Sequence, residues 1–340
     1  MSLPLRVAVA GAGVFGLASA LALARGGAQV TLHDPGSATG NASGVAAGML
    51  APVSEALTDP AAVGHLNLLQ AALAHWPSFA ERHGLVLDRA GAVLLGDEAR
   101  LSGLSASAKR LGITAPYREV GALPRLTGGY GAAIAGGLEI AGDWRIDAAA
   151  LCRLGAMAER LGVGRRPDAP RPADHDVLVV ATGPSLDFLE VAPELAVLTP
   201  IRGHILRYPH LAYAGPALRG PGVYGAPSAG GLLIGATMER GQGQAVIDPE
   251  IAAGLAAQAQ GIFPGLADQT WTAAVGVRAA TPDGLPLVGV SANPGVILAS
   301  GARRNGWLLA PLVGELVAAC AFGRDPGPWA STLAPTRERG

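Results

Sequence analysis

The chain has 340 residues, of which 50% are hydrophobic and only 15% are charged, so it can bury a large core and is not a disordered chain. Its formal net charge is -1, which argues against nucleic acid or an anionic membrane surface as the main partner. We therefore expect a small-molecule ligand and, from the length, roughly two domains.

Cysteine and histidine usage sets further limits. Cys152 and Cys320 are too few for a disulfide framework and have no metal or redox spacing, which favours a reducing, cytoplasmic location. The seven histidines show no metal-ligand spacing, so no metal is expected. Residues 7–24 form an uncharged run like a signal peptide or a short membrane helix. Three glycines interrupt that run, and we predict no membrane span.

The first half of the chain alternates predicted strands and helices. Residues 5–34 read as a βαβ unit, with a strand at 5–10, a helix at 14–25 and a strand at 30–33. Helical spacing, with a glycine as a stop signal in two cases, predicts three further helices, and an apolar run predicts a buried strand. These elements are residues 61–83, 97–111, 147–161 and 177–181.

The second half has a different sequence pattern, in which short apolar runs are separated by glycine and proline. This pattern is typical of antiparallel strands, interrupted by one predicted helix. The strands are 204–208, 223–226, 232–236 and 270–277, and the helix is 249–262. Near the end of the chain a predicted strand at 296–300 is again followed by a predicted helix, at 305–321.

A glycine fingerprint lies between the first strand and the first helix. Residues 11–16 read Gly-Ala-Gly-Val-Phe-Gly, and Asp34 closes the second strand eighteen residues later. The first glycine permits a tight turn, the second lets the backbone approach a pyrophosphate, and the third lets helix pack on strand. The carboxylate can accept from ribose hydroxyls. Dinucleotide binding is favoured over a structural turn, but NAD and FAD share the pattern.

A run of small residues follows at 41–52, Asn-Ala-Ser-Gly-Val-Ala-Ala-Gly-Met-Leu-Ala-Pro. Its backbone N–H groups could line a phosphate and a flat ring without obstruction by side chains. Composition alone slightly favours the alternative, a flexible glycine- and serine-containing loop.

Together with the fingerprint, this run resembles the glycine oxidase and D-amino acid oxidase family of FAD-dependent oxidoreductases, most closely the glycine oxidases of thiamine biosynthesis. Segments 223–238, 275–286 and 301–311 also resemble the family, and the matches fall in order along nearly the whole chain. The resemblance implies an α/β fold, with a Rossmann-like FAD-binding domain and a second α+β substrate domain built on an antiparallel sheet. We place the discontinuous FAD-binding domain at 1–60, 130–200 and 280–340, and the substrate domain at 61–129 and 201–279.

The resemblance also implies a substrate site. Arg278 matches the carboxylate-binding arginine of the family, and its planar fork suits a bidentate pair. Tyr224 matches an active-site tyrosine, and Arg304 stands with Asn305 where a helix begins near the flavin. Met49 and Met238 resemble pocket residues. The structural alternatives are a salt bridge for the arginine, core packing for the tyrosine and the methionines, and an ordinary helix cap for the asparagine.

The residues expected to bind FAD come from all the matching segments. They are Gly11, Gly13, Val14, Phe15, Gly16, Asp34, Ala42, Ser43, Ala46, Ala47, Gly48, Met49, Gly183, Arg278, Ala302, Arg303, Arg304, Asn305, Gly306 and Trp307.

The sequence also departs from the family. Arg303 stands where an aromatic residue is usual, and Gly222 where a histidine or another polar residue is usual. The family has Pro-Arg where this chain has Pro-Ser, at 227–228. A short connection at 165–175 replaces a strand pair that normally helps to cover the adenine side of FAD.

By resemblance, we expect oxidation of glycine, sarcosine or a D-amino acid to an imine, and then to a 2-oxo acid and ammonia, with oxygen reduced to hydrogen peroxide. Alternatives are a dehydrogenase of the same fold with another electron acceptor, a flavin-binding protein without turnover and, less favoured, an NAD-dependent dehydrogenase. The expected partners are the amino acid and oxygen, with no nucleic acid or membrane. An assembly of identical chains is left open.

Overall fold

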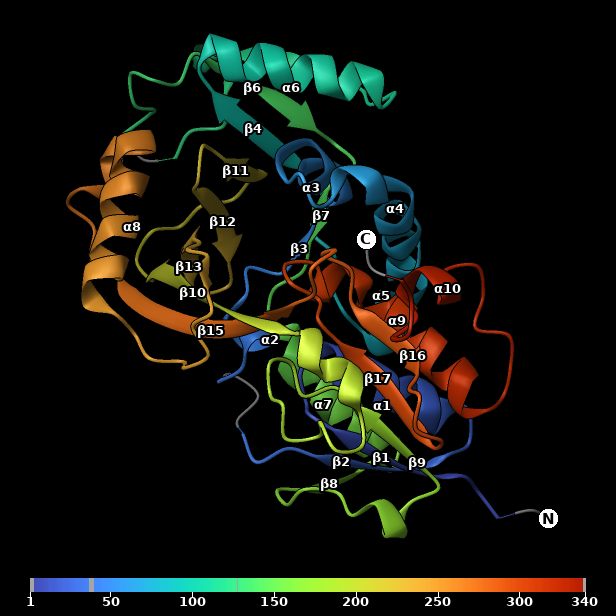
Figure 1. Ribbon diagram of the computed structural model, residues 1–340. Coiled ribbons are helices and arrows are strands. Elements are labelled where there is room, and N and C mark those ends of the chain that lie inside the picture. Colours follow the sequence, from blue (N-terminus) through green and yellow to red (C-terminus); the bar gives the residue numbers. More distant parts are fainter. Residues whose placement is uncertain (1–2, 37–39, 127, 339–340) are drawn as a thin grey trace.

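The computed structural model describes residues 3–36, 40–126 and 128–338. It contains a parallel sheet at one end of the molecule and a larger, mainly antiparallel sheet at the other (Figure 1). The expected α/β fold with a second part built on an antiparallel sheet is observed.

The six-stranded sheet carries the first βαβ unit. Its order is β16-β17-β9-β1-β2-β8, and only β16 runs antiparallel to its neighbour. The central strands are apolar because both of their faces are covered, and β1 is buried from its second residue onward. The strands are β1 (Arg6–Ala10), β2 (Gln29–His33), β8 (Gly164–Arg166), β9 (Val177–Val180), β16 (Leu287–Val290) and β17 (Val296–Ser300).

Helices cover this sheet. The first, α1 (Val14–Arg25), packs between α7 (Ala150–Arg160) and α9 (Gly306–Ala321). Both α1 and α9 are apolar around most of their circumference because each is buried between neighbours. A short α10 (Ala330–Leu333) lies beside β16. The uncharged run at 7–24 is thus a strand and a helix, and none of the described helices is both long and apolar enough to cross a membrane.

The second sheet has the order β14-β10-β13-β12-β11-β4-β6-β5, and β15 pairs with β10. Most of its pairs are antiparallel, whereas β11 and β4 are parallel. The helices α6 (Glu98–Arg110) and α8 (Pro249–Ile262) lie on its outside (Figure 1). The strands are β4 (Ala92–Gly96), β5 (Tyr117–Glu119), β6 (Gly136–Ile140), β10 (Thr199–Tyr208), β11 (Ala217–Arg219), β12 (Tyr224–Ser228), β13 (Gly231–Gly235), β14 (Glu239–Arg240) and β15 (Thr272–Ala280).

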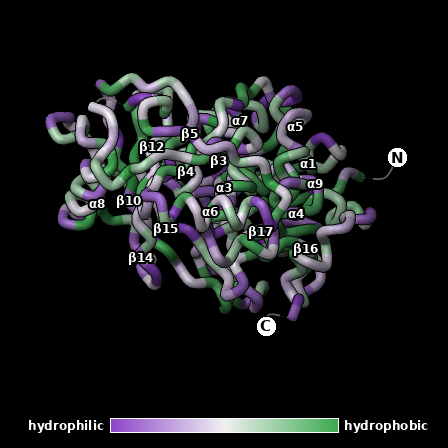
Figure 2. The backbone as a smooth tube through the Cα atoms, turned by 90° about the horizontal axis from the view of Figure 1, so that it is seen from above, coloured by the Kyte–Doolittle hydropathy of each residue, from purple (hydrophilic) through white to green (hydrophobic). Residues whose placement is uncertain are grey.

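The two sheets are joined where β15 ends. Two long strands, β10 and β15, pair along nearly their whole length and run toward the parallel sheet (Figure 1). Ala280 then forms an isolated bridge with Ala302, next to the start of α9. Hydrophobic segments run through the interior of both parts of the molecule, and strongly hydrophilic stretches lie mainly at the periphery (Figure 2).

Smaller elements complete the chain. A two-stranded ladder joins β3 to β7, and short helical turns occupy several connections. They are β3 (Met49–Leu50), β7 (Trp144–Arg145), α2 (Ala42–Val45), α3 (Pro52–Thr58), η1 (Val63–His65), η2 (Val120–Ala122), η3 (Pro172–Asp174), η4 (Pro193–Val197) and η5 (Pro264–Leu266).

Two predicted segments differ from the structure. The helix predicted at 61–83 is divided into η1, α4 (Leu66–Ala74) and α5 (Trp76–His83). Pro77 explains the second division, because it lacks an N–H and fits only in the first turn of a helix. The connection at 165–175, expected to replace the family's strand pair, begins inside β8, which pairs in parallel with β2.

The predicted domain boundaries remain a proposal. Within those boundaries, α4 packs on α9 of the parallel-sheet side, although 61–129 was assigned to the substrate domain. Conversely, β6 pairs with β4 in the antiparallel sheet, although residues 130–200 were assigned to the FAD-binding domain.

Candidate functional site

A cavity of about 790 Å³ lies at the carboxyl ends of the parallel strands. Residues that end or directly follow β1, β2, β9 and β17 line one side of it, and residues of β15 line another. This is the edge where ligands bind in open α/β sheets. We call it the elongated cavity.

The glycine fingerprint forms one wall of the elongated cavity. Gly11 has a φ of +98°, and a Cβ there would overlap the carbonyl oxygen of Ala181. A Cβ on Gly16 would overlap the carbonyl oxygen of Gly11, so α1 packs directly against the turn. Gly13 is the N-cap of α1 and provides no side-chain cap. The N-terminus of α1 therefore presents backbone N–H groups to an anion.

Asp34 directly follows β2 and also lines this cavity. One carboxylate oxygen accepts a hydrogen bond from the backbone N–H of Ala12, and the other accepts from the N–H of Gly36 at 2.6 Å. The carboxylate thus holds the glycine turn while lone pairs remain for a second donor. This geometry is compatible with a bound ribose.

The run of small residues at 41–52 is ordered by local hydrogen bonds. The side chain of Asn41 caps α2 by accepting from the N–H groups of Ser43 and Gly44, both at 3.0 Å. Ser43 accepts from the N–H of Val14 at 3.1 Å through its hydroxyl, and from the Trp307 indole at 3.0 Å through its carbonyl. The run is therefore a fixed wall between α1 and α9, and not a flexible loop.

The start of α9 forms the opposite wall. Asn305 is the N-cap, but its side chain makes no capping bond, so the first N–H groups of the helix lack an asparagine cap. Arg303, at a φ of 51°, donates its backbone N–H to Ala279 at 2.7 Å and forms an ion pair with Asp59. Arg303, which stands where the family usually has an aromatic residue, is thus held in an ion pair.

Two loops line the end of the elongated cavity near β2 and β8. Residues 167–170 follow β8, and several residues between 184 and 191 come from the opposite side. The short connection and the segment after β9 thus stand at the end that the family covers with a strand pair.

A second cavity, of about 320 Å³, adjoins the first, and four lining residues are common to both: Ala46, Arg278, Arg304 and Trp307. It lies between α3, β11, β12 and the loop at 236–238. We call it the polar cavity.

Arg278 and Tyr224 both line the polar cavity, where two glycines make room for them. A Cβ on Gly203 of β10 would overlap the guanidinium of Arg278, and a Cβ on Gly235 of β13 would overlap the phenol of Tyr224. The guanidinium donates to the carbonyl of Thr237 at 3.3 Å and contacts the Met238 sulfur at 3.5 Å. No carboxylate among the described residues forms an ion pair with it, so it remains available to an acid.

Burial shifts the pKa of both Tyr224 and Arg278. Burial raises the pKa of Tyr224 above its usual 10, so its phenol keeps its proton and can donate. Burial lowers the pKa of Arg278 below its usual value, and the nearby Arg304 and Arg303 add to the effect.

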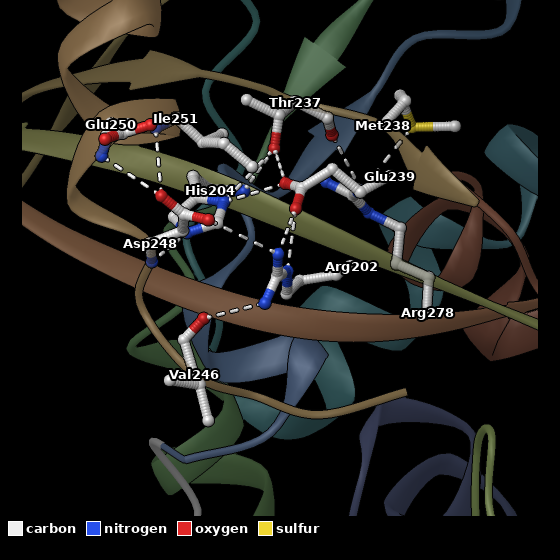
Figure 3. A network of polar contacts seen from close by, with 10 residues as sticks. All are labelled: Arg202, His204, Thr237, Met238, Glu239, Val246, Asp248, Glu250, Ile251 and Arg278. Carbon is white, nitrogen blue, oxygen red and sulfur yellow. Dashed lines mark hydrogen bonds and ion pairs between the residues drawn. The ribbon is translucent and has the colours of Figure 1, made fainter. Parts of the chain in front are cut away.

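A network behind Arg278 fixes the loop that carries Thr237 (Figure 3). His204 is fully buried; its Nδ1 lies 2.8 Å from Glu239 Oε1, and its Nε2 accepts from the N–H of Asp248 at 2.9 Å. Because Nε2 accepts, the proton lies on Nδ1. Arg202 donates to Glu239 at 2.7 Å. Burial opposes ionisation of Glu239, but bonds from Thr237, Arg202 and His204 keep its pKa below the usual value.

The polar cavity also contains charged residues that the sequence analysis missed. Glu55 on α3 accepts from Arg219 at 2.6 Å and from Arg304 at 3.1 Å, and Arg100 of α6 lines the same space. Burial would raise the pKa of Glu55, but the two arginines hold it below its usual range. The sequence contains only weak signals of these residues. Glu55 is a carboxylate just after the 41–52 run, and Arg219 ends a short apolar run.

Most predicted site residues gather at these two cavities. Gly16 and Asn305 line neither; Gly16 packs against the glycine turn, and Asn305 caps α9. The polar cavity is lined by Ala47, Gly48, Met49, Tyr224 and Met238, besides the four shared residues. The elongated cavity is lined by Gly11, Gly13, Val14, Phe15, Asp34, Ala42, Ser43, Ala46, Gly183, Arg278, Ala302, Arg303, Arg304, Gly306 and Trp307.

The sequence from residue 6 to residue 320 matches the DAO family, described as FAD dependent oxidoreductase. The chain belongs to this family. A glycine oxidase of Pseudomonas aeruginosa is 29% identical over 94% of this chain and 96% of its own length. A bifunctional protein ThiO/ThiG of a Nostoc species is 31% identical over 92% of this chain, which spans 52% of that relative.

Solved structures show the same fold as this DAO-family chain. The glycine oxidase of Geobacillus kaustophilus aligns with a TM-score of 0.84 at 24% identity, over 99% of this chain and 100% of its own. An iminodiacetate oxidase of Chelativorans sp. BNC1 also aligns with a TM-score of 0.84 at 24% identity, over 98% of this chain and 100% of its own. The expected family, enzyme class and cofactor are confirmed: this is an FAD-dependent oxidoreductase of the glycine oxidase and DAO type.

The elongated cavity fits FAD. A turn with no room for side chains suits a pyrophosphate, as does the N-terminus of α1, where Ser43 accepts from the Val14 N–H and the N-cap Gly13 has no side chain. Asp34 suits a ribose. The fixed wall at 41–52 and the start of α9 suit a flat ring.

Proposed function

We propose that this enzyme oxidises glycine, sarcosine or a D-amino acid at the α-carbon, and that molecular oxygen is the final electron acceptor. The product is an imine, which water hydrolyses to a 2-oxo acid and the free amine, while oxygen becomes hydrogen peroxide. Bound FAD supplies the two-electron chemistry. The observation that carries the proposal is Arg278, a guanidinium without a carboxylate partner among the described residues, at the wall common to both cavities.

In this proposal the protein binds and orients the substrate. Arg278 forms a bidentate pair with the substrate carboxylate, and its bond to the Thr237 carbonyl limits its rotation. Tyr224 donates its phenolic hydrogen to the same carboxylate, and Met49 and Met238 shape the polar cavity. Arg304 and the N-terminus of α9 favour negative charge at the common wall. We assign no general base, because the neutral amine loses hydride from Cα.

The test follows the flavin spectrum under anaerobic conditions while glycine, sarcosine and several D-amino acids are added. We expect bleaching by at least one of them, and peroxide once air is admitted. Arg278→Ala should lower kcat/KM about ten- to a hundredfold, mostly through KM, because one or more charge-assisted hydrogen bonds are lost.

Each alternative has its own result. Bleaching without peroxide in air would identify a dehydrogenase that uses another acceptor. A flavin that no amino acid bleaches would indicate a binding protein without turnover. Unchanged kinetics of Arg278→Ala would remove this residue from the substrate site.

A further inference from the structure

The charges that line the polar cavity do not balance. Its charged lining residues are four arginines, at 100, 219, 278 and 304, and one carboxylate, Glu55, a formal excess of three positive charges. Outside the lining, Asp59 lies 3.8 Å from Arg304, and the carboxylate of Asp143 interacts with Arg219. Arg278 and Arg100 are thus the two lining arginines without an ion pair among the described residues, and one substrate carboxylate at Arg278 would leave Arg100 unmatched. Unmatched charges are costly away from water, so the cavity favours a ligand with more than one negative charge.

Arg219 lines the polar cavity and uses only part of its hydrogen-bonding capacity. Its side chain is 7% exposed and donates through Nη2 to Glu55 Oε1, whereas Nη1 is buried without a hydrogen-bond partner in the described structure. Arg304 donates to the same Glu55 oxygen. One carboxylate oxygen is therefore shared by two guanidinium groups, and Arg219 keeps an unused donor.

Arg100 is a cation without an ion pair among the described residues, and it lines the same cavity as Arg219. Its Nε donates to the Leu95 carbonyl at 3.2 Å. The side chain is half-buried on α6. Asp97, the nearest acid on that helix, caps its N-terminus by accepting from the Arg100 backbone N–H at 2.8 Å. Asp143, behind Arg219, uses both oxygens on the N–H groups of Val53 and Ser54.

We infer that Arg219 and Arg100 form an anion subsite, and that the enzyme acts on an amino acid that carries a second acidic group, a carboxylate or a group of similar charge. Arg278 and Tyr224 hold the carboxylate beside the reacting carbon, and the second acid binds where Arg219 and Arg100 line the polar cavity. This inference rests on the proposed function and names the substrate class of the same site.

The experiment compares acids with their neutral isosteres. D-Aspartate is matched with D-asparagine, in which the second group is on the side chain, and iminodiacetate is matched with its monoamide, in which the second group is on the substituent of the nitrogen. We expect at least one acid to have a kcat/KM about ten- to a hundredfold above that of its amide, as for a charge-assisted bond. Glutarate and its monoamide, which cannot be oxidised in this way, provide a binding readout through the flavin absorbance.

Two variants assign the effect to the subsite. Arg219→Gln and Arg100→Gln should each reduce the preference for acid over amide and weaken glutarate binding. Arg110→Gln is the control, because Arg110 is exposed on the same helix as Arg100 and lines neither cavity. If loss of Arg219 prevents folding, Arg100→Gln carries the test, since it breaks no ion pair among the described residues.

Failure of the inference and failure of the proposed function give different results. If glycine or sarcosine bleaches the flavin but neither acid is preferred over its amide, or if both variants keep the preference, the subsite is overturned and the proposed function stands. If no amino acid bleaches the flavin, the proposed function fails, and tighter binding of glutarate than of its monoamide would still support an anion subsite.

Discussion

Single residues in the core show how burial decides protonation. His83 on α5 is 4% exposed and lies against Phe79, and burial lowers its pKa to about 4, with Arg25 and Arg82 adding to the effect. His75, at the start of the same helix, has the opposite shift, because its hydrogen bond to Glu315 raises its pKa. Two histidines of one helix therefore respond to pH in opposite directions.

We predict that His83 makes the protein less stable as pH falls. Its folded-state pKa is below the unfolded value, so the unfolded chain binds the extra proton first, and stability is lost from about pH 6.5 to about pH 4. The loss should reach at most about 3 kcal/mol. Denaturant unfolding of the wild type and His83→Gln across this range measures the difference.

His75→Gln is the matched control for that measurement. The His75 contribution is present at low pH and is lost as pH rises through its raised folded-state pKa, so its difference curve should have the opposite slope. Parallel curves for the wild type and His83→Gln would contradict the prediction.

At the scale of elements, the short helix α3 depends on a residue distant in sequence. α3 starts after Ala51, which offers no side-chain cap, and Pro52 has no N–H. Asp143, between β6 and β7, accepts from the next two N–H groups, of Val53 and Ser54, both at 3.0 Å. Burial raises the pKa of this carboxyl to about 6. Glu55 follows on the same helix, so Asp143 also positions the carboxylate of the polar cavity.

We predict that Asp143→Ala lowers the free energy of unfolding by roughly 2–4 kcal/mol, because two buried N–H groups lose their acceptor. Asp143→Asn should cost less, since an amide oxygen can still accept while the buried charge is removed. Thermal or urea unfolding gives both values. Equal losses for the two variants would show that the charge, and not the acceptor, holds α3.

For the whole molecule, the cofactor cavity links the two sheets, so FAD and folding are coupled. Near β2 and β8 its wall consists of two loops, 167–170 and part of 184–191, instead of the strand pair usual in the family. Loops held by few ladder hydrogen bonds open more easily than strands. We therefore expect the adenine end of FAD to be less firmly held than in relatives with that pair.

The prediction is that the purified protein is partly free of FAD and gains thermal stability as FAD is added. Mass action gives about 2.7 kcal/mol at a free FAD concentration one hundred times Kd. Melting curves at several FAD concentrations, and flavin content before and after dialysis, test this. Full occupancy after long dialysis, with no change in Tm, would mean that the loop at 184–191 covers FAD as well as the strand pair does.

The parts of this protein that depend on neighbouring residues can be predicted from the sequence. The βαβ unit, the glycine turn and the acid after β2 each follow from the conformation of a few consecutive residues, as does the start of α9 at Asn305. Local pattern also located eight of the described strands, β1, β2, β9, β10, β12, β13, β15 and β17. It missed the other nine strands of the described residues, which include β4, β6, β11 and β16, and the division of the helix at 61–83. The family was identified from such segments, because their backbone geometry is dictated locally by glycine and small residues.

The residues that line the polar cavity, in contrast, come together only through long-range contacts. Glu55 and Arg219 are 164 residues apart and meet because β11 joins the sheet beside β4, which brings α3 and α6 to the same space. No local pattern encodes such an ion pair, since a lone charged residue in an apolar run fits many sheet orders equally well. The sequence therefore could not predict that Arg100 and Arg219 line the same cavity, because this depends on the strand order.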